Sequence, residues 1–368
     1  MYGTKGSNRV DSTATETERT AFRQAEKRYK LYKSTSTLKS RSKQKKQYLE
    51  TDVSQVVDFD SVLCAHQCGE DLPFRTYRFQ CPKDPSDHPI FCFRDRPGFY
   101  FIPGALSIEE QCSWIKASLK SFPQPPNRTN HTAIYGPLRD LLSAVENERV
   151  LVQVQNSFGN EAICGDLDES KYIFTEKNSS TVHFEPCKAI PASVLLRKLR
   201  WSTLGLQFDW SKRNYDTSLP HHKIHDALCF LSKEMATPAM PYGEEFHPEA
   251  AIVNYFGPSD MLGGHLDDME ADWSKPIVSI SLGCKAIFLL GGKSREDTPV
   301  AMFLRTGDIV LMAGEARECF HGIPRIFTDE EYSDISALLL KLSDEEGNAA
   351  ILEYLKTSRI NINIRQVN

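Results

Sequence analysis

The clearest pattern in the chain is a series of short apolar or alternating runs beyond residue 245, which is typical of β-strands. Most of these runs are separated by Gly, Asp or Pro, which favour turns. They are AAIVNYFG, PIVSISLG, AIFLLGG, AMFLRTGD, IVLMAG and the terminal RININIR at 359–365. Strands do not alternate with helices here, so a parallel α/β sheet is disfavoured. The pattern predicts a mainly β (α+β) fold of the sandwich or jelly-roll type.

Helical patterns flank these strands. From residue 97, PGFYFIPGALSIEEQCSWIKASLKSF predicts a short strand, a turn at Pro103, and a helix capped by Ser107 with acidic residues in its first turn. The segment DEEGNAAILEYLKTS predicts a helix before the last strand. Near the start of the chain, TERTAFRQAEKRYKLYKS predicts an amphipathic helix, which the polar linker STSTLKSRSKQKK follows.

These patterns divide the chain into three parts. Residues 1–55 form a basic, largely disordered or helical segment, and residues 56–96 form an irregular segment that contains cysteines. Residues 97–368 form the main domain. Within it, residues at about 125–190 mix Pro, Asn, Gly and isolated apolar positions without a sustained period, which indicates an insertion.

Charge is distributed unevenly along the chain. The net charge of −5 argues against a uniformly basic nucleic-acid binder, yet residues 19–46 carry eleven Lys or Arg and one acidic residue, Glu26. Such a segment is attracted to polyanions. We interpret it either as a nucleic-acid contact or targeting segment, or as a solvated basic tail.

No apolar run approaches the roughly 18 residues that a membrane span needs, and the amino terminus lacks the apolar core of a signal peptide. The ten cysteines have no close, regular spacing, which favours reduced thiols. We therefore expect a soluble, intracellular protein that does not act at a membrane. We also expect a monomer, in the nucleus or mitochondrion or possibly the cytoplasm. The early acidic residues Asp11, Glu16 and Glu18 make a poor mitochondrial transit peptide.

Two groups of residues have the types that bind metals. Cys64, His66 and Cys68 lack the paired spacing of a zinc site, so free thiols are favoured there. The second group begins with His265 and Asp267, in a turn before the apolar run PIVSISLG. The His-x-acid pattern alone is close to chance, because His183 with Glu185 and His247 with Glu249 match it as well.

The surroundings of His265 and Asp267 make them distinctive. His321 follows the strand-like run DIVLMAG, and Asn254 lies on the strand that precedes the turn. The terminal strand alternates strictly, so one of its faces carries Arg359, Asn361, Asn363 and Arg365. Two arginines on an inward face are costly to bury without an anion.

Two imidazoles and one carboxylate leave three positions of an octahedral Fe(II) open, as in non-haem oxygenases. A 2-oxo acid can take two of these positions and O2 the third. The distal carboxylate of the oxo acid then needs a bidentate cation, which arginine supplies better than lysine.

The chain resembles the AlkB-type Fe(II)/2-oxoglutarate dioxygenases, and among them the subtype of the first eukaryotic AlkB homologue. The motifs that carry this resemblance are NYF-x8-HLD, SKPIVSISLGCKAIFLLGG, FHGIPR and TSRININ, with Arg365 close behind. PGFYFIPGAL and KLRWSTLGLQFDW extend it to residues 97–122 and 194–368. The resemblance implies a double-stranded β-helix (jelly-roll) core with flanking helices and a basic N-terminal tail, and it makes residues 97–368 the dioxygenase domain.

The resemblance also implies roles for individual residues. The metal ligands would be His265, Asp267 and His321. The residues that hold 2-oxoglutarate would be Arg359 at the distal carboxylate and, near the metal-chelating end, Asn254, Asn361 and Arg365. Phe256 stands where the family has a tyrosine, which removes one hydrogen bond to the oxo acid.

Substrate recognition departs from the subtype. Leu206 and Phe208 stand where the subtype has a Tyr-x-Tyr pair that contacts the base, and Trp201 is a candidate for stacking on the base or, alternatively, a core residue. The acidic residues near the metal turn, which would repel phosphate, are Asp268, Glu270 and Asp272. The basic residues that would compensate are Arg197, Lys198, Arg200, Lys212 and Arg213.

The function implied is oxidative demethylation of nucleobases with Fe(II), 2-oxoglutarate and O2, releasing succinate, CO2 and formaldehyde. For this subtype the substrates would be N1-methyladenine in tRNA and methylated adenine or cytosine in DNA or RNA, in an unpaired or flipped base. One alternative keeps the iron chemistry but acts on proteins, as a histone or other protein hydroxylase or demethylase. A second alternative is a non-catalytic binding protein that has retained the barrel.

Overall fold

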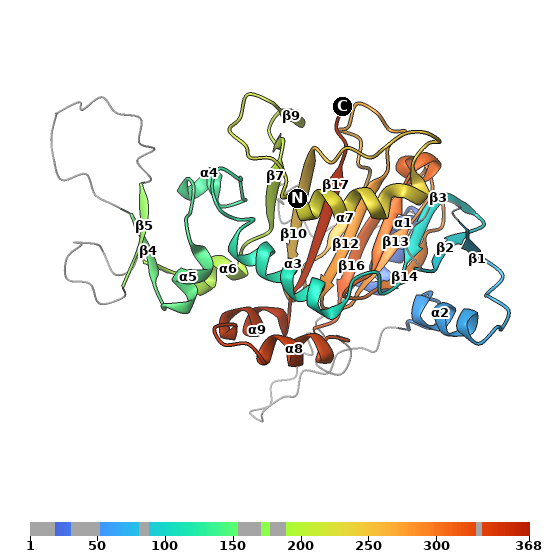
Figure 1. The fold of residues 1–368 in the computed structure, drawn as a ribbon, viewed down its shortest axis with the longest axis horizontal. Coiled ribbons are helices and arrows are strands. Elements are labelled where there is room, and N and C mark those ends of the chain that lie inside the picture. The colour runs from blue at the N-terminus through green and yellow to red at the C-terminus, as the bar shows by residue number, and fades with distance from the viewer. Residues whose placement is uncertain (1–18, 31–51, 81–87, 154–170, 177–188, 329–332) are drawn as a thin grey trace.

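Two antiparallel sheets form the centre of the molecule (Figure 1). The computed structural model describes residues 19–30, 52–80, 88–153, 171–176, 189–328 and 333–368. The larger sheet has eight strands, which in order across the sheet are β1 (Thr76–Phe79), β2 (Ile90–Phe93), β3 (Arg96–Ile102), β15 (Ile309–Met312), β12 (Ile277–Gly283), β17 (Arg359–Arg365), β10 (Ala250–Phe256) and β7 (Trp201–Gly205). The smaller sheet consists of β11 (Leu262–His265), β16 (His321–Ile326), β13 (Ala286–Leu290) and β14 (Val300–Leu304).

The six apolar runs beyond residue 245 all form strands, and a further strand, β16, begins at His321. One apolar cluster joins the facing surfaces of the two sheets, with Phe256 and Val310 from the large sheet and Phe288 and Met302 from the small one. The predicted mainly β, jelly-roll type of fold is therefore confirmed.

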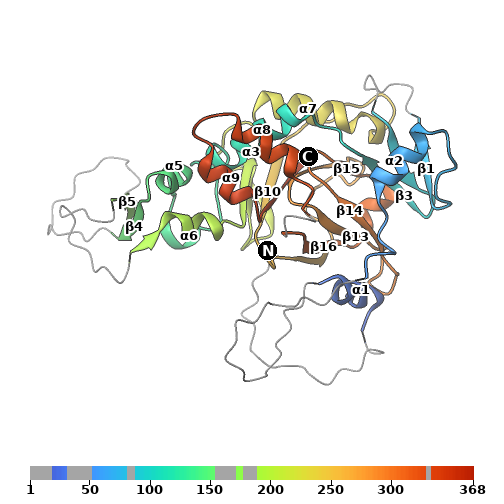
Figure 2. The same ribbon diagram turned by 90° about the horizontal axis from the view of Figure 1, so that it is seen from below.

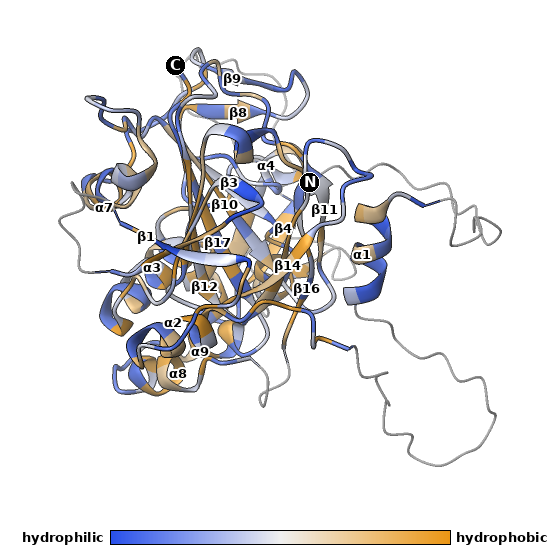
Figure 3. Cartoon of the chain, turned by 90° about the vertical axis from the view of Figure 1, so that its right-hand side faces the viewer, coloured by the Kyte–Doolittle hydropathy of each residue, from blue (hydrophilic) through white to orange (hydrophobic). Residues whose placement is uncertain are grey.

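The terminal strand β17 has the expected alternation. Ile360, Ile362 and Ile364 are buried in the core cluster on the outer face of the large sheet. Helices cover that face and share the cluster: α3 (Ile108–Lys120), α7 (Asp226–Ala236), α8 (Ser336–Ser343) and α9 (Ala349–Leu355). In the hydropathy view the strands at the centre are mostly apolar, whereas the hairpin at the upper end is largely polar (Figure 3). The polar residues of β17 therefore face the space between the sheets.

Helix α3 begins where the sequence predicts. Its N-cap residue is Ser107, and the side chains of Ser107 and Glu110 form a reciprocal capping box. The helix predicted before the last strand corresponds to α9, while α8 was not anticipated. None of the described helices is long and apolar enough to cross a bilayer.

The N-terminal amphipathic helix packs on the barrel. Helix α1 (Ala21–Tyr29) lies on the outer face of the smaller sheet (Figure 2), where Phe22 and Tyr29 join a buried cluster with Ile287 and Leu289. The predicted linker and most of the basic segment lie outside the described residues. The described part of the segment is therefore a structural element of the fold, because its apolar face is buried.

Residues 56–96, for which the sequence predicts no regular elements, contain α2 (Phe59–Gln67), β1 and β2. The Phe59 ring stacks on that of Phe101 in β3, with centroids 3.9 Å apart. The two strands are only four residues long, so they show too little periodicity to be recognised, but they extend the large sheet.

The predicted insertion at about 125–190 also contains regular elements. They are α4 (Thr132–Tyr135), α5 (Leu141–Glu146), β4 (Val150–Gln153), β5 (Tyr172–Thr175) and, just beyond, β6 (Ile190–Pro191) and α6 (Ala192–Arg197). Strands β4, β5 and β6 form a separate sheet that projects from the barrel (Figure 1). A hairpin of β8 (Gln207–Asp209) and β9 (Asn214–Asp216) follows β7.

Candidate metal centre and its cavities

The three predicted metal ligands lie together at one end of the smaller sheet. His265 ends β11 and His321 begins β16, and the two residues are direct partners in the antiparallel register. Asp267 follows in the loop after β11, with its carboxylate 3.7 Å from Nε2 of His265 and 3.6 Å from Nε2 of His321. Their ligand atoms all lie within 4.8 Å of one another. Among the described residues, no other group of three histidines, cysteines or acids meets this condition.

Backbone carbonyls orient both imidazoles. Nδ1 of His265 donates to the carbonyl of Gly263 at 3.0 Å, and Nδ1 of His321 donates to that of Cys319 at 3.2 Å. These bonds place the proton on Nδ1 and leave Nε2 with a free lone pair directed toward Asp267. The tautomer and ring orientation therefore suit metal ligation by both Nε2 atoms.

The charges at the centre are set by burial and by one arginine. Burial, and then the neighbouring His321, lower the pKa of His265 to about 4, which keeps its imidazole neutral. Burial opposes ionisation of Asp267, but the Arg365 guanidinium and the two imidazoles outweigh it and hold the pKa of Asp267 well below its usual range. Neutral imidazoles and an ionised carboxylate are the donor set that a divalent transition metal requires.

Arg365 belongs to a buried network of charges. Its guanidinium contacts the Asp267 carboxylate at 3.0 Å and the Glu270 carboxylate at 2.8 Å. Glu270 also accepts from Arg317 at 2.7 Å and from the Tyr215 hydroxyl at 3.2 Å. The expectation that Glu270 is a surface acid that repels phosphate is therefore wrong, because its carboxylate is fully buried between two arginines.

The network also holds the loop that carries Asp267. Arg317 donates to the backbone carbonyls of Asp267 at 3.2 Å and Lys275 at 2.8 Å. It comes from the short 3-10 helix Gly314–Glu318, just before His321. The sequence gives no direct signal of this role, since a charged residue in a turn is usually exposed.

An inner cavity lies between the sheets behind the metal centre. Its lining includes the three candidate ligands and the polar face of β17, namely Arg359, Asn361 and Asn363. Arg359 is almost completely buried and donates through Nη2 to Ser281 Oγ at 3.0 Å, while its Nε and Nη1 have no hydrogen-bond partner among the described residues. Burial lowers the pKa of Arg359 to about 10. Buried guanidinium donors without partners indicate a place for an anion.

The other residues predicted for the oxo-acid site do not all line the same cavity. Asn361 lines the inner cavity and donates to Ser279 Oγ and to the carbonyl of Ile280, both at 2.9 Å. The Phe256 ring packs between the sheets, 5.4 Å from the Arg359 guanidinium. Asn254 lines an outer cavity with Arg365 instead.

The outer cavity, of about 530 Å³, also reaches the metal centre. It shares four lining residues with the inner cavity: Leu262, His265, Asp267 and Asn363. The remaining wall includes Phe208, Trp210 and Phe320 with Arg213 and Arg295. The metal centre thus lies where an inner chamber, with the polar face of β17 on one side, and an outer chamber with aromatic walls meet.

Of the three predicted substrate residues, Phe208 lines the outer cavity, whereas Trp201 and Leu206 do not. Trp201 lies behind the wall, with its ring 5.3 Å from that of Trp210. Trp210 was missed by sequence reasoning, although it follows Phe208 at a spacing of two. Its indole Nε1 is buried and has no hydrogen-bond partner in the part of the chain that the structure describes.

The basic residues expected to contact phosphate are mostly engaged within the fold. Arg197 donates to the carbonyls of Glu353 and Tyr354. Arg200 pairs with Asp260, and Lys212 pairs with Asp209 and Asp216. Arg213 alone among the five lines the outer cavity, where it reaches Asp268 at 3.5 Å.

Comparison with known proteins gives a family and several relatives. Residues 98–365 match the 2OG-Fe(II) oxygenase superfamily. The chain is 60% identical over 353 residues to the DNA N(6)-methyladenine demethylase ALKBH1A of Arabidopsis thaliana, with 95% of this chain and 96% of the relative covered. It is 34% identical over 285 residues to the nucleic acid dioxygenase ALKBH1 of Homo sapiens, which covers 74% of this chain and 64% of the relative.

A third relative is the tRNA demethylase abh1 of Schizosaccharomyces pombe, 31% identical over 283 residues, with 76% of this chain and 82% of the relative covered. The region that matches the superfamily contains the metal centre and the residues that line the inner and outer cavities.

Proposed function

The chain belongs to the 2OG-Fe(II) oxygenase superfamily and to its AlkB-type members, and from this membership we propose that it demethylates bases of nucleic acids by oxidation. The relatives are named for activity on DNA, on nucleic acid generally and on tRNA. The substrate proposed is therefore a methylated base, foremost a methylated adenine, in an unpaired segment of DNA or RNA.

The enzyme is an Fe(II)/2-oxoglutarate-dependent dioxygenase. When bound, Fe(II), 2-oxoglutarate and O2 supply the oxidant that hydroxylates the methyl carbon, after which formaldehyde leaves, and succinate and CO2 are the co-products. The protein's part is to hold these components in order and to keep the base in place.

We assign the iron ligands to His265, Asp267 and His321. Two imidazoles and one ionised carboxylate suit Fe(II), and they leave coordination positions for a co-substrate. Arg365 keeps the carboxylate ionised and in position through its 3.0 Å contact. In a second layer, Glu270 holds Arg365.

The inner cavity suits 2-oxoglutarate, which has a carboxylate at each end. Arg359 lies deep in the cavity with two donor groups free, so it would bind the distal carboxylate. Asn361 lies on the same strand face between Arg359 and the metal centre, and would approach the middle of the oxo acid. Phe256 contributes an aromatic face to the Arg359 guanidinium but no hydrogen bond.

The outer cavity suits a base that has left its stack. Phe208, Trp210 and Phe320 provide aromatic surface, and the unpartnered Trp210 indole can donate to a polar edge of a base. Arg213 and Arg295 at the same cavity favour a substrate that carries phosphates.

The proposal depends above all on one observation: two chambers meet at the metal centre. One contains the two unpartnered donor groups of Arg359, and the other has aromatic walls. The proposal is tested with purified protein, Fe(II), O2 and 2-oxoglutarate in the presence of a methylated oligonucleotide, its unmethylated counterpart or a methylated peptide. We expect succinate and formaldehyde to form in equal amounts with the methylated oligonucleotide only.

Turnover with the methylated peptide but not with the oligonucleotide would favour a protein demethylase and reject the proposal. Asp267→Ala serves as the control, because it removes the anionic ligand and leaves two imidazoles. We expect this variant to produce neither succinate nor formaldehyde, and substantial activity in it would overturn the assignment of the metal centre.

A further inference from the structure

A groove of about 710 Å³ lies outside the two cavities of the metal centre. Its walls are the segment from Pro125 to Arg139 and the loop that follows β9. The lining is rich in proline and basic residues, including Pro125, Pro126, Arg128, Arg139, His221 and His222. Among the described residues that line it, none is acidic. The groove thus has rigid walls and a positive lining.

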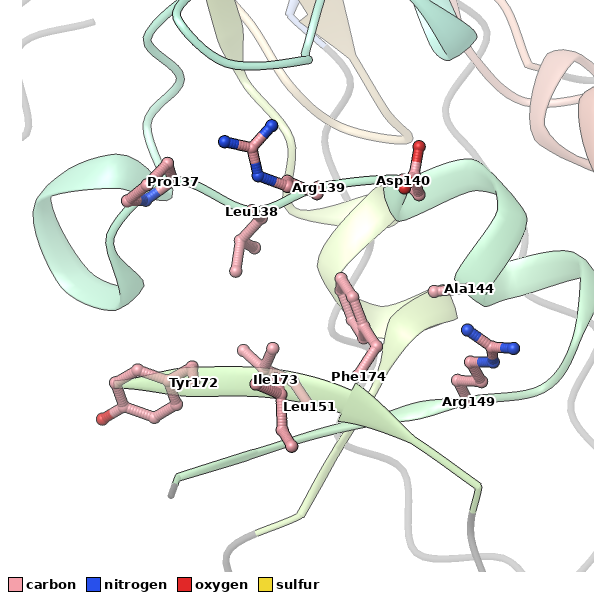
Figure 4. A pocket seen from close by; sticks show the side chains of 10 residues that line it. All are labelled: Pro137, Leu138, Arg139, Asp140, Ala144, Arg149, Leu151, Tyr172, Ile173 and Phe174. Carbon is pink, nitrogen blue, oxygen red and sulfur yellow. The ribbon is translucent and has the colours of Figure 1, made fainter. Parts of the chain in front are cut away.

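Its two arginines have no partner for their charge. Across the described residues, the guanidinium groups of Arg128 and Arg139 make no hydrogen bond or ion pair, unlike those of Arg197, Arg200 and Arg305. Arg139 is exposed and Arg128 is half-buried. A smaller cavity lies beside Arg139, and Figure 4 shows the Arg139 guanidinium turned away from Leu151 and Phe174, which line that cavity. Both charges are therefore available to an anion.

The groove lies close to the outer cavity. Residues 128–130 run along the free edge of β7, where Thr129 pairs with Ser202 and the Arg128 carbonyl accepts from the Thr203 amide at 3.0 Å. On its other side, β7 pairs with β10, which carries Asn254 at the outer cavity. Two strand spacings, about 10 Å, thus separate β10 from this segment. If one nucleotide is held in the outer cavity, the next nucleotide of the strand can span this distance to residues 128–130.

Aromatic rings from β7 and from the β8–β9 hairpin form a row. The Trp201 and Trp210 centroids are 5.3 Å apart, those of Trp210 and Phe208 are 4.7 Å apart, and those of Phe208 and Tyr215 are 5.1 Å apart. Trp201 faces Asn254 directly in the β7–β10 register, so both side chains lie on the same face of the sheet. Aromatic rings next to a positive groove are typical of surfaces that bind single strands.

One continuous segment, from β8 to the loop that follows β9, bounds both the outer cavity and the groove. Phe208, Trp210 and Arg213 line the outer cavity, and the chain then continues to Leu219 and His222 in the wall of the groove. A strand leaving the outer cavity along this segment would reach the groove.

We propose that the groove binds the phosphodiester backbone of the unpaired strand on one side of the target nucleotide, with Arg128 and Arg139 as the phosphate contacts. This inference rests on the proposed function, and it extends that function by assigning a path to the nucleotides that flank the methylated base. It also predicts that a longer single strand binds more tightly than a minimal fragment.

The test compares a labelled single-stranded 15-mer, methylated at its centre, with a methylated trinucleotide. The double variant Arg128→Ala/Arg139→Ala is matched with Arg78→Ala/Arg149→Ala. This control removes two other arginines whose guanidinium groups have no ion-pair partner among the described residues and which do not line the groove. We expect the groove variant to reduce the affinity advantage of the 15-mer over the trinucleotide about tenfold. Its plot of log affinity against log salt should be shallower by about 1.4, because each phosphate contact on a single strand contributes about 0.7.

Three outcomes would overturn the inference. They are an unchanged length dependence in the groove variant, an unchanged salt slope, and an equal loss in the control variant, which would indicate a general effect of charge. If the wild-type protein demethylates the 15-mer, such a failure concerns the groove alone. If it neither binds nor demethylates the 15-mer, the proposed function fails and the inference fails with it.

Discussion

At the scale of single residues, the chemistry depends on a few side chains whose polar atoms are held in place or left free. The Nε2 atoms of His265 and His321 are directed at Asp267 because both Nδ1 atoms are bound to carbonyls. By contrast, Nε and Nη1 of Arg359 are buried and unbound. In a site that binds charged ligands, the residues that position the site are expected to have all their hydrogen bonds made. A few groups that contact the ligand are expected to lack a hydrogen-bond partner in the protein.

The substitution Phe256→Tyr tests the oxo-acid end of the site. Its ring lies 5.4 Å from the Arg359 guanidinium, so a hydroxyl added there can donate to the oxo acid that Arg359 would bind. One hydrogen bond contributes about 1 kcal/mol, so we expect the KM for 2-oxoglutarate to fall about fivefold. Steady-state kinetics with the methylated substrate measures the change. Phe303→Tyr, on the outer face of the smaller sheet, is the matched control. An equal KM in wild type and Phe256→Tyr would show that the added hydroxyl does not reach the oxo acid.

His131 predicts a dependence of stability on pH. It is buried, and its Nε2 donates to the Leu195 carbonyl at 3.0 Å. Burial lowers the pKa of His131 from its ordinary value of 6.5. Below pH 6.5 the unfolded chain therefore takes up a proton that the folded chain does not, so the stability contribution present above that pH is lost as the pH falls.

His131→Gln keeps a donor for Leu195 but removes the titration. We expect the Tm of this variant to fall less than that of wild type when the pH is lowered from about 8 to about 5. Parallel Tm profiles for the two proteins would contradict the account of His131.

The sequence predicts the roles of some of these residues but not of others. The triad and the arginines of β17 were found because strict alternation and a resemblance of motifs both indicate them. Glu270 and Arg317 were missed because their burial depends on each other, and nothing in the sequence marks residues 47 positions apart as partners. Trp210 was missed because its place at the outer cavity depends on the path of the β8–β9 hairpin.

At the scale of elements, helix α1 supports the strand that carries the first metal ligand. Glu26 is almost fully buried, and its carboxylate accepts from the Gly264 amide at 2.6 Å. Arg295 donates to the Gly264 carbonyl at 2.6 Å. Strand β11 is at the edge of its sheet, so these side chains satisfy backbone groups that have no neighbouring strand. Phe22 fits closely over Gly264, where a Cβ atom would lie 2.4 Å from its ring.

Removing the Glu26 carboxylate should therefore weaken metal binding indirectly, through the position of β11. We expect Glu26→Ala to weaken Co(II) binding about tenfold, a magnitude typical of groups that orient metal ligands. Glu26→Gln keeps an acceptor oxygen and should bind Co(II) nearly as wild type does. Titration followed by Co(II) absorbance measures both. Equal affinities in wild type and Glu26→Ala would show that the helix does not support β11.

Element prediction succeeded where the pattern was local. The α3 capping box and the alternation of β17 are legible within a few residues. The docking of α1 was not foreseen, because its buried face contains only a few apolar side chains among many basic residues. The Phe22 ring packs against Gly264 and Gly291, which both lie more than 240 residues away in the sequence.

At the scale of the whole molecule, the large sheet divides the apolar core into two main parts. One core cluster lies outside the large sheet, beneath its helices, and another lies between the sheets around the inner cavity. The jelly-roll class could be predicted from the strand pattern and the resemblance. The neighbours of each strand could not, because β7, β10, β17 and β12 are adjacent in space but distant in sequence. The monomeric state and the expected compartments stay predictions.

The overall charge of −5 makes the salt dependence of binding informative. If local basic sites such as the groove bind phosphates, affinity for a single-stranded oligonucleotide should fall steeply between low and moderate salt despite the net negative charge. Fluorescence anisotropy at several salt concentrations measures this slope. An affinity that does not change with salt would indicate a substrate other than nucleic acid.

The most direct test of the account is an anaerobic titration of the protein with Fe(II) and 2-oxoglutarate, followed by the visible charge-transfer band of Fe(II) chelated by a 2-oxo acid. We predict that the band saturates at one Fe(II) and one 2-oxoglutarate per chain. It should be absent in Asp267→Ala, and in Arg359→Met it should require a much higher concentration of 2-oxoglutarate. A band of undiminished intensity in Asp267→Ala, or no band in the wild-type protein, would contradict the assignment of His265, Asp267 and His321 as the iron centre.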